Sequence, residues 1–419
     1  MSAQMKLGAF LMPTGHHIAA WRHPQADSRM GVDVSQYIRL AQAAEAAGFD
    51  MVFLEDAAGL REENTRVASQ TARSIGFEPL SLLAAMAART SRIGLVATAS
   101  TSYNEPYALA RAFATLDLVS AGRAGWNLVT SASAIEAANF GAEGLRKHVD
   151  RYHRANEFAD VVARLWDPAT RAATLHHKGE HFEVQQGLGL PASPQGKPVM
   201  VQAGASDVGR DLAARTADVV FTAAQTFESA KSFYDDVKAR ARRAGRNPDH
   251  IKIMPGVSPV VAQTREAAQR KVDELQALIP DDVGLSLLAS YLATDALRDL
   301  PLDGPMPDLT ATEGMQSRQA LVVEQARRDN LTIRQVARHF AGARGHWRLV
   351  GTAQDIVDEL ERWFTGGACD GFNVMPAFFP GELDSFIALV VPELQRRSLF
   401  RRTYEGDTLR ANLGLSLPS

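Results

Sequence analysis

The sequence predicts an α/β fold, a (β/α)8 TIM barrel with insertions that forms a single domain over residues 1–419. Short apolar runs alternate with longer amphipathic stretches along the chain, as they do where strands and helices take turns. Most of the apolar runs are continuous, which is typical of parallel strands covered on both faces. No G-x-G-x-x-G follows any of them, and this argues against the dinucleotide-binding type of open sheet.

Eight apolar runs are the strand candidates, and each is expected to lead into a helix. In order, the strands are expected at 7–12, 51–55, 93–98, 124–130, 198–203, 218–223, 251–262 and 371–376. Amphipathic stretches predict helices at 34–48, 79–90, 106–122, 151–166, 207–217, 227–245, 264–278, 352–367 and 381–398. Several of these stretches end in glycine, which readily adopts the left-handed conformation that closes a helix.

Two segments interrupt the alternation and are interpreted as insertions near 57–78 and 279–349. The second contains a stretch rich in proline and glycine at 301–314. Long insertions in compact barrels are often lids or oligomer contacts, so we expect a lid, with a surface decoration as the alternative.

Composition excludes several classes of protein. The chain has 46% hydrophobic residues and a net charge of −3, which fits a large core and offers no basic surface for nucleic acid. Its single cysteine, Cys369, excludes an internal disulfide and suggests a reducing compartment. No apolar stretch approaches the roughly 18 residues that span a bilayer, and the first residues lack a signal-peptide pattern. A soluble cytoplasmic protein without a nucleic-acid or membrane partner is expected.

Two kinds of chemistry find little support at the predicted strand ends. His16 and His17 follow the first strand, as in barrel metallohydrolases, but later strands end in "VQAG", "VFTAA" and "NVMPA", which supply no further ligand. We therefore expect no metal. No G-x-S-x-G is present for a serine nucleophile, and Cys369 has no base signature near it.

Neutral hydrogen-bonding groups follow the strands instead. They are Thr98, Asn127, Thr130, Ser131, Gln202 and Ser206. Such a mouth suits a planar cofactor with polar edges. "GASDVG" (204–209) opens the fifth predicted helix, where free N–H groups form either an anion site or an ordinary helix cap. His148 and Tyr152 lie four residues apart on one helix face, as a packing pair or as donors to the same anion.

Six segments together resemble the bacterial-luciferase-like flavin monooxygenases, and more closely the branch of nitrilotriacetate monooxygenase component A. They are "FLEDAAG", "ATASTSYNEPY", "GRAGWNLVTS", "HVDRYHRANEF", "VQAGASDVG" and "VVPELQRR". The resemblance covers nearly the whole chain and implies a barrel that takes reduced FMN as a co-substrate from a separate NAD(P)H-dependent flavin reductase. It implies that O2 and this FMN oxygenate a small-molecule substrate through a flavin hydroperoxide, in a homodimer or homotetramer.

The resemblance also assigns residues. By motif, Asp56, Thr98 and Asn127 would line the flavin ring. The phosphate would be held by His148, Tyr152 and Ser206 with the backbone of Gly204 and Ala205. His17 matches a histidine at the pocket mouth, so His17 and Asn127 are the catalytic candidates.

One position departs from the family pattern. Ala132 stands where the alkane-oxidising member has a histidine directly after "VTS", so an alkane substrate is not expected. Two alternatives remain open. One is a deazaflavin-dependent oxidoreductase of the same fold, and the other is a flavin-binding protein without turnover.

Overall fold

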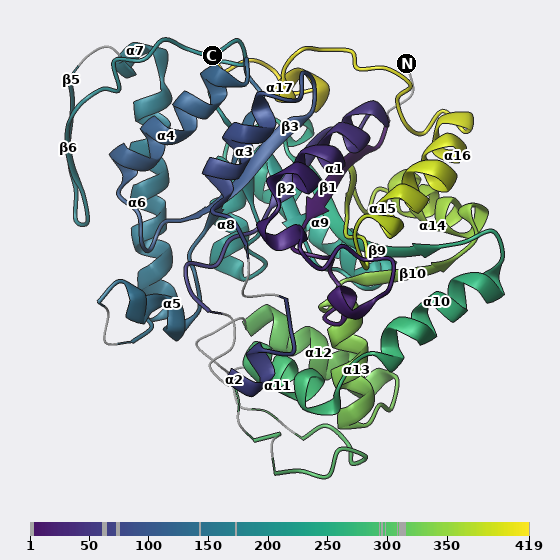
Figure 1. The fold of residues 1–419 in the computed structure, drawn as a ribbon. Coiled ribbons are helices and arrows are strands. Elements are labelled where there is room, and N and C mark those ends of the chain that lie inside the picture. Colours follow the sequence, from purple (N-terminus) through teal and green to yellow (C-terminus); the bar gives the residue numbers. More distant parts are fainter. Residues whose placement is uncertain are drawn as a thin grey trace.

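A closed barrel of eight parallel strands forms the centre of the computed structural model (Figure 1). The structure describes residues 4–418 except 61–64, 73–75, 142–143, 172–173, 293, 295, 298, 308 and 310–315. Around the ring the strands are β1 (Lys6–Leu11), β2 (Met51–Leu54), β3 (Gly94–Ser100), β4 (Ala124–Val129), β7 (Val199–Gln202), β8 (Val219–Thr222), β9 (Lys252–Val261) and β11 (Gly371–Val374). β11 pairs with β1 and closes the ring, which confirms the predicted fold class.

Amphipathic helices cover the outside of the barrel. They are α1 (Val34–Ala46), α3 (Pro79–Ala87), α4 (Pro106–Val119), α6 (His148–Trp166), α8 (Asp207–Thr216), α9 (Phe227–Arg243), α10 (Arg265–Ala277), α14 (Ala353–Thr365), α15 (Gly381–Ser385) and α16 (Val391–Arg396). A π-helical turn over Phe386–Val390 joins the last two, so the helix predicted at 381–398 is present with one irregular turn. α6 begins at His148, three residues before the predicted start, so His148 lies in its first turn.

Side-chain caps mark where several of these helices begin. Asp33, Ser206, Thr226, Thr264 and Thr352 each accept a hydrogen bond from an N–H group two or three residues further on. Each satisfies a backbone donor that the first helical turn leaves without an internal partner. These polar residues therefore separate the buried strands from the helices that follow.

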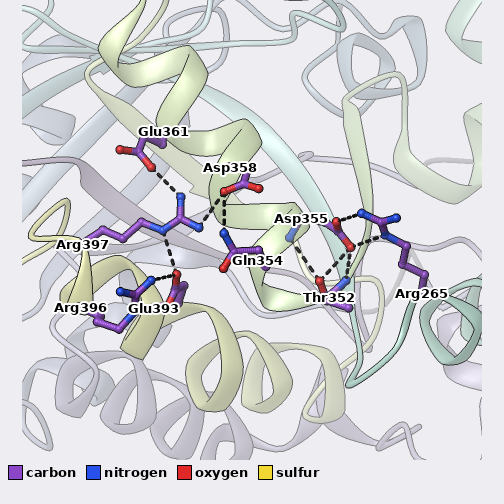
Figure 2. Close-up of polar contacts among 9 residues, drawn as sticks. All are labelled: Arg265, Thr352, Gln354, Asp355, Asp358, Glu361, Glu393, Arg396 and Arg397. Atoms are coloured by element: carbon purple, nitrogen blue, oxygen red, sulfur yellow. Dashed lines mark hydrogen bonds and ion pairs between the residues drawn. The ribbon is translucent and has the colours of Figure 1, made fainter.

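Ion pairs join α14 to its neighbours (Figure 2). Arg397 reaches Asp358 at 2.7 Å, Glu361 at 2.6 Å and Glu393 at 2.8 Å. On the other side of α14, Arg265 Nε donates to Asp355 at 2.9 Å, and Figure 2 shows this pair beside the helix cap. The network joins α14 to α10 on one side and to α16 on the other.

Four features depart from the predicted alternation. β10 (Trp347–Gly351) is an additional parallel strand that pairs with Val257–Val261 of β9, so the helix predicted at 352–367 follows β10 rather than one of the eight barrel strands. A hairpin of β5 (Thr174–Lys178) and β6 (Glu183–Gln186) lies between α6 and β7. Shorter helices are α2 (Thr65–Ala68), α5 (Ala134–Asn139), α7 (Pro168–Arg171) and α17 (Leu409–Asn412).

The fourth departure is the insertion near 279–349, which contains the helices α11 (Asp281–Leu292), α12 (Gln316–Arg328) and α13 (Ile333–Ala343). These helices gather with α2 below the strands in Figure 1. Of the stretch 301–314, positions 308 and 310–314 lie outside the described residues. No helix within the described ranges is long and apolar enough to cross a membrane.

The C-terminal segment fills the opposite end of the barrel. Leu409, Leu413 and Leu415 are buried in one cluster with Val96 and Val199 from inside the strands. Figure 1 shows α17 at the top, near both termini and away from the insertion. One end of the barrel is thus filled by the chain's own apolar side chains, and loops and the insertion surround the other.

Candidate functional site

The carboxyl end of β4 places Asn127 inside the barrel. Parallel pairing sets Asn127 opposite Thr98 on β3 and opposite Val201 on β7. Asn127 is 3% exposed, and its Nδ2 donates to Thr98 Oγ1 at 2.8 Å. Its Oδ1 is buried and has no hydrogen-bond partner among the residues that the structure describes. An unpaired buried amide oxygen costs about 1–3 kcal/mol, so the site fits a ligand that presents an N–H donor at this point.

Glu55 enters the same mouth, although the sequence analysis did not select it. Side chains alternate along a strand, so Glu55 follows buried Phe53 on the inner side, whereas Asp56 falls on the other side and is exposed. Glu55 Oε2 accepts a hydrogen bond from Arg344 Nη2 at 2.8 Å. This alternation was the available signal for Glu55. The role of Asp56 beside a flavin ring stays a prediction.

Arg344 brings the insertion to the barrel mouth. It closes α13 in the left-handed conformation, with φ at 54°. Its Nη1 donates to Met12 Sδ at 2.6 Å and lies 3.4 Å from Nδ1 of His16. The other ring nitrogen of His16, Nε2, lies 2.8 Å from the carbonyl oxygen of Phe10. His16 therefore has partners on both ring nitrogens and joins β1 to the insertion.

His17 is a buried neutral imidazole at this rim. It is 4% exposed, and burial, followed by the charges of Arg348 and His23, lowers its pKa to about 3. Its Nδ1 accepts a hydrogen bond from the backbone N–H of Ala19 at 3.2 Å, which leaves the ring proton on Nε2. Nε2 is buried and has no hydrogen-bond partner in the described ranges. His17 thus presents an unpaired neutral donor.

The loop between β7 and α8 meets the start of α6. Ser206 caps α8 by accepting from the N–H of Gly209 at 3.3 Å. The N–H of Gly204 donates to Gln202 Oε1 at 2.7 Å, so that group already has an acceptor. The N–H groups of Ala205 and Ser206 have none among the described residues, and they lie at the positive end of a helix dipole.

Tyr152 rests against this loop. Its hydroxyl oxygen lies 3.0 Å from where a Cβ on Gly204 would be and 2.9 Å from the equivalent point on Gly209. The rings of His148 and Tyr152 have centroids 4.8 Å apart. The structure therefore places Tyr152 against Gly204 and Gly209, with His148 beside the tyrosine ring, and a Cβ at either glycine would lie too close to the tyrosine hydroxyl. The described ranges contain no group of three or more His, Cys, Asp or Glu side chains that could hold a metal ion.

Comparisons with known proteins find similarity over most of the chain. A family model described as luciferase-like monooxygenase matches residues 10–369. N-acetyl-S-(2-succino)cysteine monooxygenase of Bacillus subtilis (strain 168) is 46% identical over 99% of this chain and 97% of its own. Nitrilotriacetate monooxygenase component A of Aminobacter aminovorans is 44% identical over the same shares. A solved structure of riboflavin lyase with modified FMN and riboflavin is 30% identical with a TM-score of 0.87, over 99% of this chain and 97% of that one.

Proposed function

The chain belongs to the luciferase-like monooxygenase family, and from that premise we propose that it uses O2 and reduced FMN to oxygenate a small organic substrate. A separate NAD(P)H-dependent flavin reductase would supply the reduced FMN. The name "component A" of one relative supports a second component, and a similar solved structure contains modified FMN. The observation that carries the proposal is the unpaired Oδ1 of Asn127 inside the barrel mouth.

Each end of the proposed site matches one part of FMN. Asn127 Oδ1 would accept an N–H of the flavin ring, while Thr98 fixes the amide in that orientation. The N–H groups of Ala205 and Ser206 would hold the phosphate, with the Tyr152 hydroxyl beside them. Val201 of β7 pairs with Asn127, and Gly204 lies three residues further along the chain. The phosphate would therefore lie further out along the barrel axis than the flavin ring.

Bound reduced FMN would supply the electrons that activate O2. The chain would orient the ring, donate a hydrogen bond from His17 Nε2 and keep water away from the reacting atoms. Apolar side chains inside the strands form the floor of the mouth, among them Phe10, Phe53 and Met375. The insertion would limit the access of water from the open end of the barrel, because Arg344 fixes the insertion to the mouth.

An anaerobic titration with reduced FMN tests the proposal, using the native chain, Asn127→Ala and Asn247→Ala. Removing the amide acceptor should weaken binding about tenfold, since one ligand hydrogen bond is lost. Asn247 caps a short helix before β9 at the other end of the barrel, so its variant should bind as the native chain does. Native protein without saturable binding of reduced FMN would reject the proposal, as would equal binding by all three proteins.

A further inference from the structure

Arg348 is a half-buried cation at the barrel mouth, and its partners among the described residues are neutral. Its Nη2 lies 3.3 Å from Nδ1 of His339, and the amide oxygen of Gln276 accepts from its Nη1 at 3.1 Å. No carboxylate in the described part of the chain forms an ion pair with it, whereas Arg344 at the same rim pairs with Glu55. Burial lowers the pKa of Arg348. Within the described part of the chain the guanidinium therefore has no counter-ion.

Another arginine shows how the chain satisfies such a group when no anion is needed. Arg123, at the other end of β4, donates to four backbone carbonyl groups and to the Thr90 hydroxyl. Arg348 has two neutral contacts in place of those five bonds. It lies near the carboxyl ends of α10 and α13, whose dipoles offset part of its charge without supplying a full negative charge.

The strand register directs Arg348 toward the mouth. On β10 it is the pairing partner of Ser258 on β9, and paired residues of neighbouring strands project to the same side. Ser258 is 1% exposed, and its Oγ has no hydrogen-bond partner among the described residues. Two neighbouring strands therefore place the Arg348 guanidinium and an unpaired hydroxyl on one face.

His17 adds a donor beside this arginine. Arg348 Nη1 and His17 Cδ2 lie 3.2 and 3.5 Å from the point that a Cβ on Gly342 would occupy, so one small space borders both side chains. Nε2 of His17, bonded to that Cδ2, is the unpaired donor. The side-chain amide of Gln276 borders the same space, 2.6 Å from that point, so the absence of a Cβ at Gly342 of α13 leaves room for all three side chains.

We infer that Arg348 and His17 form a subsite for one carboxylate group of the substrate, which is therefore an organic acid rather than a neutral hydrocarbon. This inference rests on the proposed function and names the class of its substrate. A carboxylate there accepts charge-assisted hydrogen bonds from the guanidinium and a further one from His17 Nε2. The phosphate of FMN is the other possible anion, but the loop proposed for it follows β7, with β8 and β9 between that strand and β10.

Calorimetric titration of the flavin-free chain with succinate tests the subsite, with the uncharged diamide succinamide as the comparison probe. Native protein should bind succinate saturably and succinamide far more weakly. Arg348→Gln should weaken succinate binding at least about tenfold, since a charge-assisted hydrogen bond is lost. Arg265→Gln is the matched control because Arg265 is exposed and already paired with Asp355, as Figure 2 shows. Its variant should bind succinate as the native chain does.

Gly342→Ala provides a second variant that keeps the charge and fills the space. Its methyl group would meet the flexible end of Gln276, so the helix should still fold, while succinate binding should fall with Arg348 intact. Native protein that does not bind succinate, or both variants binding as tightly as the native chain, would overturn the inference.

Titration with reduced FMN separates this inference from the proposed function. If Arg348→Gln weakens FMN and leaves succinate unaffected, the arginine serves the phosphate and the subsite is refuted, while the monooxygenase proposal stands. If the native chain binds succinate but not reduced FMN, the subsite stands and the proposed function fails.

Discussion

Two histidines at the mouth, buried His17 and half-buried His339, are held in the neutral form. Burial, with the charge of Arg348 next in importance, lowers the pKa of His17 to about 3 and that of His339 to about 4. In the unfolded chain both would titrate near 6.5. The unfolded state therefore binds more protons than the folded state between these values. The stability that the neutral histidines contribute is complete above about pH 6.5 and is lost as the pH falls toward 4 and 3.

The free energy of unfolding should accordingly fall as the pH is lowered from 6.5 to 4, by up to about 1.4 kcal/mol per pH unit for each histidine. His339→Gln removes one of the two titrating groups. The free energy of unfolding should then change less steeply with pH, by up to about 1.4 kcal/mol per pH unit. Urea unfolding across this range measures the slope, and the same substitution at exposed His176 is the control. Identical slopes for native and His339→Gln proteins would show that His339 does not contribute in this way.

Residues at strand ends were the predictable part of the site. Thr98 and Asn127 follow from the rule that barrel chemistry lies at the carboxyl ends of strands, and the structure joins them by a hydrogen bond. Arg344 and Arg348 were not predictable, because the insertion that carries them reaches the mouth only through contacts distant in sequence. No local pattern marks an arginine whose partner, Glu55, lies 289 positions away.

Polar contacts hold the insertion helices to the mouth. Arg344 contacts Glu55, the N–H of Ile18 donates to the carbonyl of Ala341 at 3.0 Å, and Arg66 of α2 reaches Asp282 of α11 at 2.5 Å. These contacts join the insertion to the loops after β1 and β2. If the insertion excludes water, weakening one of them should uncouple O2 consumption from product formation.

Arg344→Gln tests this role of the insertion. The variant leaves Glu55 without its guanidinium, so stability should fall by about 1–3 kcal/mol. The H2O2 released per O2 consumed, measured with reduced FMN and substrate, should rise. Arg328→Gln, on α12 and already paired with its neighbour Asp329, should keep the native ratio. An unchanged ratio in Arg344→Gln would refute the covering role.

The sequence predicted every strand of the barrel, but it did not predict the helices of the insertion or β10. α13 carries apolar residues at Ile333, Val336, Ala337, Phe340 and Ala341, so the helical spacing was present but was not used. β10 is harder to recognise. Its five residues, WRLVG, include an arginine and pair only with the part of β9 beyond β8.

In the whole molecule, the C-terminal segment and the candidate site lie at opposite ends of the barrel. The C-terminal segment fills the end away from the site with Leu409, Leu413 and Leu415. Two buried ion pairs fasten it, Arg401 to Asp50 and Arg410 to Asp218. The sequence did not predict this closure, because apolar residues in a short final segment do not show what they pack against.

Leu413→Ala should therefore destabilise the fold without changing ligand binding. Leu413 is fully buried, and truncating such a side chain costs about 2–5 kcal/mol. Affinity for reduced FMN should stay as in the native chain at temperatures where the variant is folded. Leu417→Ala, at a position 66% exposed, should change the free energy of unfolding by less than about 0.5 kcal/mol. Weaker FMN binding in folded Leu413→Ala would show that the two ends are coupled.

The central claim is that the carboxyl end of the barrel holds a flavin between Asn127 and the start of α8. A crystal of the native chain soaked with FMN tests it most directly. Electron density should place a ring N–H within hydrogen-bond distance of Asn127 Oδ1, and the phosphate against the N–H groups of Ala205 and Ser206. A flavin bound elsewhere, or a phosphate lying away from residues 204–206, would contradict the account.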